Sequence, residues 1–212
     1  MSAFLVVLDA DSTLLHDEVI ELIAAEAGTE PLVASITARA MHGELDFVQS
    51  LRERVGTFAG LPESALVRVR ARVTVTKGAS ELVTAVQAAG GAVGVVSGGF
   101  HEILDPIAAA LGLDFLRANR LGVADGRLTG EVDGPIVDAV AKAASLVEWS
   151  ERSGIPLSRT VAVGDGANDL QMMQEAALSV AFNAKPVVRE RADVAVNRRD
   201  LSQVLPLLGL RG

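Results

Sequence analysis

The strongest constraint on the fold is a set of short, nearly continuous runs of apolar residues. Three of them cover residues 4–8, 92–96 and 160–163. A strand with one face in water alternates polar and apolar residues, whereas a strand covered on both faces of a parallel sheet is apolar throughout. Helical patterns separate the runs, so the sequence predicts an α/β fold with a doubly wound parallel sheet.

The region that follows the first run has a different pattern. From about residue 15 to 73 the apolar residues recur at helical spacing, and no segment is typical of a buried strand. We therefore expect a core domain of residues 1–14 and 74–212, with a small helical domain of residues 15–73 inserted after the first strand. The pair Asp125-Gly126, between two strand-like segments, also predicts a β-hairpin.

The composition limits the classes of partner. The 212-residue chain has a formal net charge of −8 and only 3% aromatic residues, which argues against a nucleic-acid-binding surface, because such surfaces are basic or stack bases on aromatic rings. The absence of cysteine excludes disulfides and thiolate metal sites. No uninterrupted apolar stretch reaches the about 18 residues of a membrane span, and Asp9 and Asp11 interrupt the first run too early for a signal peptide. We therefore expect a cytoplasmic protein.

Polar segments follow each of the three apolar runs. They are residues 9–13, 97–99 and 164–169, and the last two are rich in glycine. The carboxyl ends of parallel strands lie on one edge of the sheet, where open α/β sheets bind their ligands. We therefore expect the three segments to form one site.

Several side chains in these segments have more than one interpretation. Asp9 and Asp11 point to the same side of an extended chain and repel each other, so they indicate a metal site, an acid and base pair, or only turn chemistry. Asp165 and Asp169, with Asn168 between them, supply hard oxygen ligands that suit Mg²⁺. The same residues are also typical caps of a helix.

Two further residues are ambiguous on the sequence alone. Ser97, followed by two glycines and then a helical pattern, forms either an anion-binding seat or an ordinary turn. Lys142 lies among small apolar residues. It is therefore either an exposed lysine whose stem covers apolar surface, or a buried cation with an anionic partner.

These segments, in this order, resemble the four motifs of the haloacid dehalogenase superfamily. The matching residues are DADST at 9–13, Ser97, Lys142 and GDGAND at 164–169. The chain is also similar to the branch of that superfamily that hydrolyses O-phospho-L-serine at the end of serine biosynthesis, through Glu18, GELDFVQSLRERV, VVSGGF, ANRL, DGRLTGEV and FNAKP. It departs from that pattern at Ala10, where phenylalanine is usual, and at Val75, where proline is frequent.

The resemblance implies a Mg²⁺-dependent phosphatase with a phosphoaspartate intermediate. Asp9 is the expected nucleophile. Asp11 is expected to protonate the leaving oxygen and then to take a proton from water, and we expect the nearby Asp9 to raise its pKa. Mg²⁺ would be held by Asp9, the backbone carbonyl of Asp11 and Asp165.

Other core residues are implied to bind the phosphoryl group or to support the metal. Lys142, the Ser97 hydroxyl and the Gly98 amide would bind the phosphoryl oxygens. Asn168 and Asp169 would position the metal-bound waters and Lys142, and Asn168 would also contact the substrate.

The resemblance also implies that the helical insert is a cap that closes over the strand ends. Glu18 would pair with the substrate ammonium, and Arg54 would bind the substrate carboxylate as a planar fork. Met41 and Phe47 would form walls of the pocket. Without the resemblance, the two charged residues are typical of a solvated helix face, and the two apolar residues of a helical core.

The alternatives differ in substrate or in class. The same chemistry could act on phosphohomoserine or another small phosphomonoester, and a non-enzymatic phospho-acceptor of the receiver type also places an acidic pocket, a hydroxyl and a lysine on such a sheet. Asp11 and the helical insert argue against the acceptor, because only turnover needs a second acid. The expected partner is a small phosphorylated amino acid, with no nucleic acid and no membrane, and the protein is expected to be a monomer or homodimer.

Overall fold

A seven-stranded sheet forms the centre of the protein in the computed structural model, which describes residues 3–211. The strand order is β4-β3-β2-β1-β5-β6-β7, and only β4 is antiparallel to its neighbour. The strands are β1 Leu5–Leu8, β2 Ala92–Phe100, β3 Phe115–Ala124, β4 Arg127–Asp133, β5 Thr160–Gly164, β6 Leu178–Phe182 and β7 Val194–Val196. This arrangement confirms the predicted doubly wound parallel sheet.

Strand β1 shows why the apolar runs do not alternate. It lies between β2 and β5, with Leu5 opposite both Ala92 and Thr160, and all four of its residues are fully buried. Val6 packs into the cluster on one face of the sheet, and Val7 into the cluster on the other face. Both faces of β1 are therefore core, which favours an apolar residue at every position of the strand.

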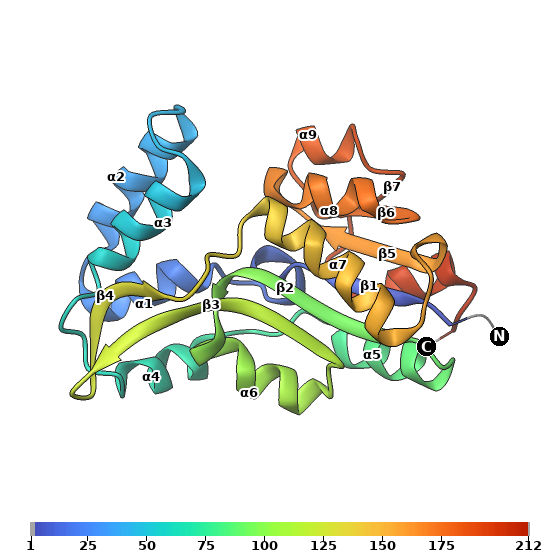
Figure 1. Ribbon diagram of the computed structural model, residues 1–212, viewed down its shortest axis with the longest axis horizontal. Helices are drawn as coiled ribbons and strands as arrows, with labels where there is room; N and C mark the ends of the chain where they lie inside the picture. Colours follow the sequence, from blue (N-terminus) through green and yellow to red (C-terminus); the bar gives the residue numbers. More distant parts are fainter. Residues whose placement is uncertain (1–2, 212) are drawn as a thin grey trace.

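Helices cover both faces of the sheet (Figure 1). Residues of α5, α6 and the 3₁₀ segment η4 pack on the face of Val6, whereas residues of α7 and α8 pack on the face of Val7. The bounds are α5 Ala79–Ala88, α6 His101–Leu111, α7 Ala139–Ser153, α8 Leu170–Glu175, α9 Pro186–Arg189 and η4 Leu201–Leu208; the short 3₁₀ turns are η2 Leu157–Arg159 and η3 Ala167–Asp169. None of the helices in residues 3–211 is long and apolar enough to cross a membrane.

Four helices lie between β1 and α5. They are α1 Val19–Ala27, α2 Glu30–Met41, α3 Phe47–Gly56 and α4 Ala65–Arg72. Figure 1 shows α2 and α3 standing beyond the sheet as a separate lobe, while α1 and α4 lie closer to it. Helix α3 begins at a capping box, because Asp46 accepts from the Gln49 N–H and the Gln49 side chain accepts from the Asp46 N–H.

The predicted hairpin is present as β3 and β4, and it contacts the helical insert. Its turn has positive φ at Asp125 (50°) and Gly126 (70°), the conformation that such a two-residue turn requires. The Gly60 N–H donates to the Leu128 carbonyl at 2.8 Å, and the Leu128 N–H donates to the Leu61 carbonyl at 2.9 Å. The hairpin therefore joins the insert by backbone hydrogen bonds.

One detail differs from the sequence-based expectation. Ser97, Gly98 and Gly99 do not form a turn ahead of a helix, because β2 continues through Phe100 with a shift of register relative to β3. Helix α6 contains Pro106, which has no N–H to donate to the backbone carbonyl four residues earlier.

That carbonyl belongs to Glu102, and it accepts instead from the Arg70 guanidinium of α4 at 3.2 Å. A side chain from the insert thus replaces the backbone donor that Pro106 lacks.

Candidate active site

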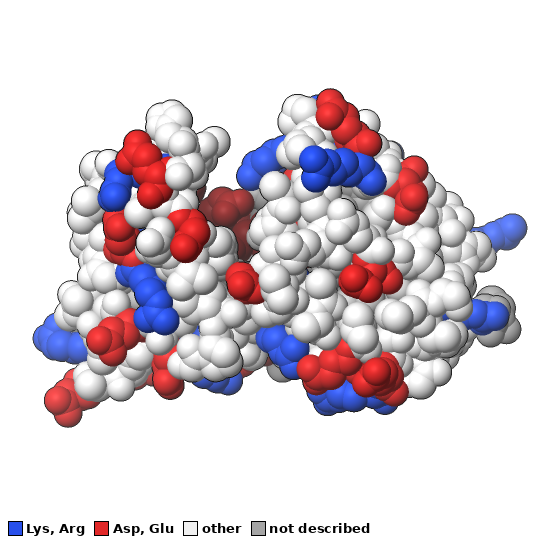
Figure 2. All heavy atoms as spheres, turned by 45° about the horizontal axis from the view of Figure 1, so that its top comes forward, with Lys and Arg blue, Asp and Glu red and all other residues white. Residues whose placement is uncertain are grey.

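A small cavity lies at the carboxyl ends of β1, β2 and β5, where the three polar segments meet. Its volume is about 120 Å³, below the roughly 300–1,000 Å³ of pockets for drug-sized ligands, so it suits a small metabolite. Figure 2 shows a cleft between two lobes with acidic side chains at its floor. The cavity is lined by Asp9, Asp11, Glu18, Ile20, Phe47, Leu51, Arg54, Gly98, Gly99, Asp165, Gly166, Asn168 and Lys185.

The tight turn after β1 brings two carboxylates to the cavity. Asp9 still follows the strand, because its N–H donates to the Val163 carbonyl of β5 at 2.9 Å. The π-type turn η1, Ala10–Leu14, then reverses the chain. Within it Ser12 has a left-handed backbone with φ 58°, which is uncommon for a residue other than glycine. The Ser12 hydroxyl donates to the Glu18 carboxylate at 2.7 Å.

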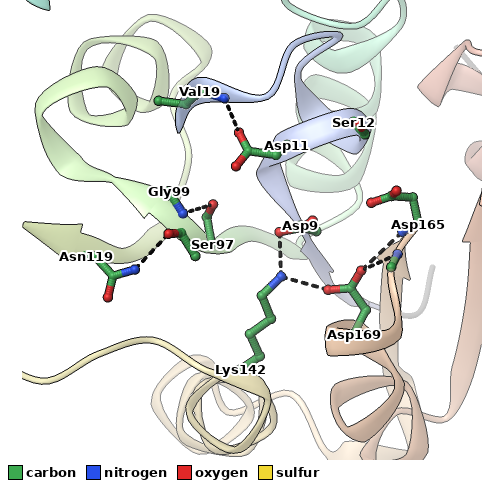
Figure 3. A network of polar contacts seen from close by, with 12 residues as sticks. Asp9, Asp11, Ser12, Val19, Ser97, Gly99, Asn119, Lys142, Asp165 and Asp169 are labelled. Atoms are coloured by element: carbon green, nitrogen blue, oxygen red, sulfur yellow. Dashed lines mark hydrogen bonds and ion pairs between the residues drawn. The ribbon is translucent and has the colours of Figure 1, made fainter. Parts of the chain in front are cut away.

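Lys142 is a buried cation held between two carboxylates. Its Nζ lies 2.5 Å from Asp9 Oδ1 and 2.8 Å from Asp169 Oδ1, and its side chain is 1% exposed. Figure 3 shows the lysine reaching from α7 toward the ends of β1 and β5. Lys142 is therefore a buried cation with anionic partners, and not an exposed lysine whose stem covers apolar surface.

The charges in this group act on one another strongly, because little water reaches them. Burial lowers the pKa of Lys142, but the carboxylates of Asp169 and Asp9 outweigh that effect and raise it above its ordinary value. Burial raises the pKa of Asp9, and the neighbouring Asp169 raises it further, while Lys142 opposes both. The positive charge of Lys142 is therefore what makes two adjacent buried carboxylates tolerable.

Asp169 is positioned by the backbone of the segment before it. Its Oδ2 accepts from the Asp165 N–H at 3.1 Å and from the Gly166 N–H at 3.0 Å. A Cβ on Gly164 would lie only 2.3 Å from the same oxygen. Glycine at this position is therefore required by the close approach of the Asp169 carboxylate.

The carboxylates of three aspartates lie close enough together to hold one metal ion. Asp9, Asp165 and Asp169 each offer a carboxylate oxygen, and these three oxygens lie within 4.8 Å of one another. Hard carboxylate oxygens suit Mg²⁺ or Ca²⁺ rather than zinc, so the donor set fits a divalent cation. Burial and the neighbouring Asp169 raise the pKa of Asp165 to about 6, with Lys185 opposing the rise. A bound cation would favour the ionised form.

Asp11 points away from the metal-binding group. Its Oδ1 accepts from the Val19 N–H at the start of α1, at 3.2 Å (Figure 3). Burial raises its pKa to about 7, and Glu18 is the next largest cause. Asp9, which we expected to raise this pKa, is not among the main causes. Burial and the Glu18 carboxylate therefore account for most of the rise in the pKa of Asp11, although Asp11 in turn raises the pKa of Asp9.

The end of β2 is fixed by a residue that the sequence did not point out. Ser97 is fully buried, and its hydroxyl accepts from the Gly99 N–H at 2.8 Å. The side-chain amide of Asn119, on β3, donates to the Gly98 carbonyl and accepts from the Val137 N–H, both at 2.8 Å. Only the segment ANRL in the sequence could have indicated this role for Asn119.

The helical insert contributes Glu18, Phe47 and Arg54 to the cavity lining, as expected. A Cβ on Gly98 would lie 3.1 Å from the Phe47 ring, so a glycine there leaves room for the insert to approach the sheet. Burial lowers the pKa of Arg54, and the carboxylates of Glu18 and Asp11 oppose that shift. On the side of the insert, the cavity is therefore lined by one acidic residue, Glu18, and one basic residue, Arg54.

Met41 does not line the cavity. It is the last residue of α2 and 82% exposed. The expected wall residue thus lies at the outer end of the α2–α3 lobe, because the turn after α2 faces solvent. Ile20 and Leu51, which the sequence did not point out, supply the apolar lining from the insert.

Lys185 is a further lining residue that we did not expect. It follows β6, and its N–H donates to the Asp165 carbonyl at 3.1 Å. The segment FNAKP contains it, and that segment was the one signal in the sequence that could have indicated it.

Comparison with known proteins agrees with this geometry. Residues 6–174 match the family model of haloacid dehalogenase-like hydrolases. A phosphoserine phosphatase of Streptomyces coelicolor is 57% identical over 206 residues, which cover 97% of this chain and 50% of that protein. A phosphoserine phosphatase of Streptococcus thermophilus is 50% identical over 204 residues, covering 96% of this chain and 95% of that protein. The chain thus spans half of one relative and nearly all of the other.

Solved structures show the same similarity. A phospho-aspartyl intermediate analogue of phosphoserine phosphatase has a TM-score of 0.91 at 44% identity, over 98% of this chain and 99% of that one. A substrate-bound phosphoserine phosphatase complex gives the same values. With the match to the family model over most of its length, this chain belongs to the haloacid dehalogenase-like hydrolase family.

Proposed function

We propose that this protein hydrolyses O-phospho-L-serine to L-serine and phosphate, as the last step of serine biosynthesis. The observation that carries the proposal is the buried Asp9–Lys142–Asp169 group beside a cavity that also holds Glu18 and Arg54. The relatives named phosphoserine phosphatase, at up to 57% identity among those above, support the substrate.

In the proposed reaction the Asp9 carboxylate attacks phosphorus. An oxygen–phosphorus bond forms at Asp9, and the bond from phosphorus to the serine oxygen breaks. Repulsion between two unit charges 4 Å apart is about 4 kcal/mol at an effective dielectric constant near 20. Lys142, the Ser97 hydroxyl and the Gly98 amide are proposed to offset this repulsion at the phosphoryl oxygens.

Asp11 is proposed to supply the proton that the departing serine oxygen needs. A pKa of about 7 leaves a substantial fraction of this carboxyl protonated near neutral pH. After serine leaves, the ionised Asp11 takes a proton from the water that attacks the phosphoaspartate, which regenerates Asp9. Both half-reactions thus use one residue, first as an acid and then as a base.

Mg²⁺ is the proposed cofactor. When bound, it would neutralise charge on the phosphate and the surrounding carboxylates. The residues proposed to hold it are Asp9, Asp165 and the Asp11 carbonyl. Asn168 and Asp169 are proposed to support it, and Asn168 to contact the substrate as well. The grouping of three aspartate oxygens supports a divalent cation at this place.

Residues 15–73 are proposed to form a cap domain over a core of residues 1–14 and 74–212. On its side of the cavity, Glu18 is proposed to bind the substrate ammonium and Arg54 the substrate carboxylate. Phe47 is proposed as an apolar wall. The presence of one acidic and one basic residue of the insert in the cavity lining supports recognition of an amino acid, which carries both an ammonium and a carboxylate group.

A phosphate-release assay tests the proposed reaction. O-phospho-L-serine should be hydrolysed with Mg²⁺, and activity should disappear with a chelator and in Asp9→Asn. Hydrolysis by Asp9→Asn at the wild-type rate would contradict the role of Asp9. Stable phosphorylation of Asp9 without turnover would instead favour a phospho-acceptor.

A second assay tests the substrate. Arg54→Ala should lose activity on O-phospho-L-serine but keep it on p-nitrophenyl phosphate, which has no carboxylate or ammonium. Arg54→Lys is the matched control, because it keeps the charge but loses the planar fork. Equal losses on both substrates, or faster hydrolysis of phosphohomoserine by the wild type, would favour another small phosphomonoester.

We also propose that the protein acts in the cytoplasm, as a monomer or homodimer, without nucleic acid or membrane. The acidic net charge and the lack of cysteine support this proposal. Light scattering of the purified protein would determine the number of subunits.

A further inference from the structure

Lys185 is a charged residue of the cavity that the proposed mechanism does not use. It lines the cavity beside Asp165, Gly166 and Asn168, on the core side and not on the side of the insert. Among residues 3–211, no carboxylate oxygen lies within 4.0 Å of its Nζ, whereas Lys142 has two such partners. Lys185 is therefore a cation at the cavity that is not neutralised by an ion pair.

The backbone around Lys185 is fixed independently of its side chain. Its N–H donates to the Asp165 carbonyl at 3.1 Å, and its carbonyl accepts from the Val188 N–H at 3.0 Å. Two residues earlier, Asn183 has a left-handed backbone with φ 46°, and its N–H donates to the Val196 carbonyl at 2.7 Å. These contacts would remain in a variant that changes only the Lys185 side chain.

The charge balance of the cavity indicates what this side chain is for. Four lining residues are acidic, and only Arg54 and Lys185 are basic: the acids are Asp9, Asp11, Glu18 and Asp165. Arg54 lies on the insert, where Glu18 and Asp11 act on its charge. Figure 2 shows basic side chains on the rim of the cleft across from the insert lobe. An entering phosphate dianion therefore meets a mostly acidic cavity, with Lys185 on the core side.

We propose that Lys185 captures the phosphoryl group: its ammonium contacts the phosphate of the entering substrate and of the departing inorganic phosphate. A lysine is a flexible point charge with three donors, and an exposed cation beside an acidic cavity raises the rate and the affinity of anion binding. The inference rests on the proposed phosphatase function. It assigns Lys185 to binding of the phosphate, and not to the chemical step.

Binding of inorganic phosphate to the Mg²⁺-loaded protein tests the inference directly. In titration calorimetry, Lys185→Ala should raise the Kd for phosphate about tenfold, the effect of one charge-assisted hydrogen bond. Lys185→Arg should bind phosphate nearly as the wild type does. Arg189→Ala is the matched control, because it removes the same charge one turn further along on the exposed surface and should leave the Kd unchanged.

Kinetics provide the second readout. Lys185→Ala should raise KM for O-phospho-L-serine about tenfold and change kcat by less than about threefold, because binding and not chemistry is affected. An unchanged Kd for phosphate, an equal effect of Arg189→Ala, or a fall in kcat alone would overturn the inference. A wild type that binds phosphate through Lys185 but does not hydrolyse phosphoserine would leave the inference standing and contradict only the proposed substrate.

Discussion

At the scale of single residues, the protein depends on one buried lysine between two buried carboxylates. Lys142 reaches Asp9 and Asp169 from a different element of the chain than either of them. An ion pair in water contributes little to stability, but a buried one cannot lose a partner without leaving a charge unpaired. The site is therefore also part of what holds α7 against the sheet.

The first prediction concerns that lysine. Lys142→Met keeps the length of the side chain and removes its charge, which leaves Asp9 and Asp169 buried without a cation. The free energy of unfolding at pH 7 should fall by about 3–5 kcal/mol, measured by urea denaturation. Lys185→Met is the matched control and should cost less than about 0.5 kcal/mol, because that lysine is exposed. A loss below 1 kcal/mol in Lys142→Met would contradict the prediction.

At the scale of elements, a side chain of helix α4 supplies a hydrogen bond that the backbone of helix α6 lacks: Arg70 donates to the Glu102 carbonyl. Arg70→Ala should leave the Glu102 carbonyl without its donor and cost about 1–2 kcal/mol of unfolding free energy. Pro106→Ala restores an N–H that can donate to that carbonyl within the helix. In the Pro106→Ala background, Arg70→Ala should therefore lower the free energy of unfolding by less than it does in the wild type. Chemical denaturation of the wild type, the two single variants and the double variant would measure this difference. Equal costs in both backgrounds would contradict this account.

Asp200 connects two elements and makes stability depend on pH. It caps η4 through the Ser202 N–H at 3.1 Å, and Lys77 lies 2.9 Å from its carboxylate. The hydrogen bond from the Ser202 hydroxyl, and then that from Lys77, lower the pKa of Asp200 below its ordinary value. A depressed folded-state pKa contributes stability above the unfolded pKa, near 4, and this contribution is lost as pH falls through the folded value.

Asp200→Ala should accordingly lower the free energy of unfolding at pH 7 by about 1–2 kcal/mol, the cost of losing a cap. The difference from the wild type should shrink as the pH falls below about 4. Denaturation at a series of pH values measures both effects. Asp133→Ala, at an exposed aspartate of β4, is the control and should show neither. A difference that stays constant down to pH 3 would refute the explanation.

At the scale of the whole molecule, the insert is joined to the sheet at two places. The two chain segments that connect it pair with each other, since the His16 N–H donates to the Thr74 carbonyl at 2.9 Å. The hairpin of β3 and β4 forms the second junction, through Gly60 and Leu128. One continuous apolar cluster also contains side chains of the sheet and of the insert. The two junctions and the shared apolar cluster therefore fix the insert relative to the sheet, and with it the shape of the cavity between them.

A metal ion should stabilise the whole fold, because the three clustered aspartates repel one another without it. Mg²⁺ at about one hundred times its Kd should raise Tm by about 5 °C or more, measured by differential scanning calorimetry. A chelator should reverse the rise, and Asp165→Asn should reduce it strongly. An equal rise in Asp165→Asn would show that Mg²⁺ binds elsewhere.

The sequence by itself was enough to predict the sheet, the hairpin and the meeting of three polar segments at one edge. These features follow from local patterns. A continuous apolar run favours a strand that is buried on both faces, and the carboxyl ends of parallel strands lie on the same edge of the sheet. The sequence also singled out Asp9, Asp11, Lys142 and Asp165. Their roles in the reaction and the division into domains remain predictions.

Only the tertiary structure decided which side chains meet. It placed Lys142 between two carboxylates from other segments, gave Asp11 its pKa through burial and Glu18, and left Met41 in solvent. It also brought Lys185 to the cavity from the end of β6. Such contacts join residues that are far apart in the chain, and the strength of a charge depends on how much water surrounds it. A local sequence pattern contains neither the long-range contacts of a residue nor its exposure to water. The sequence could therefore locate the site, whereas the fold determined its electrostatics.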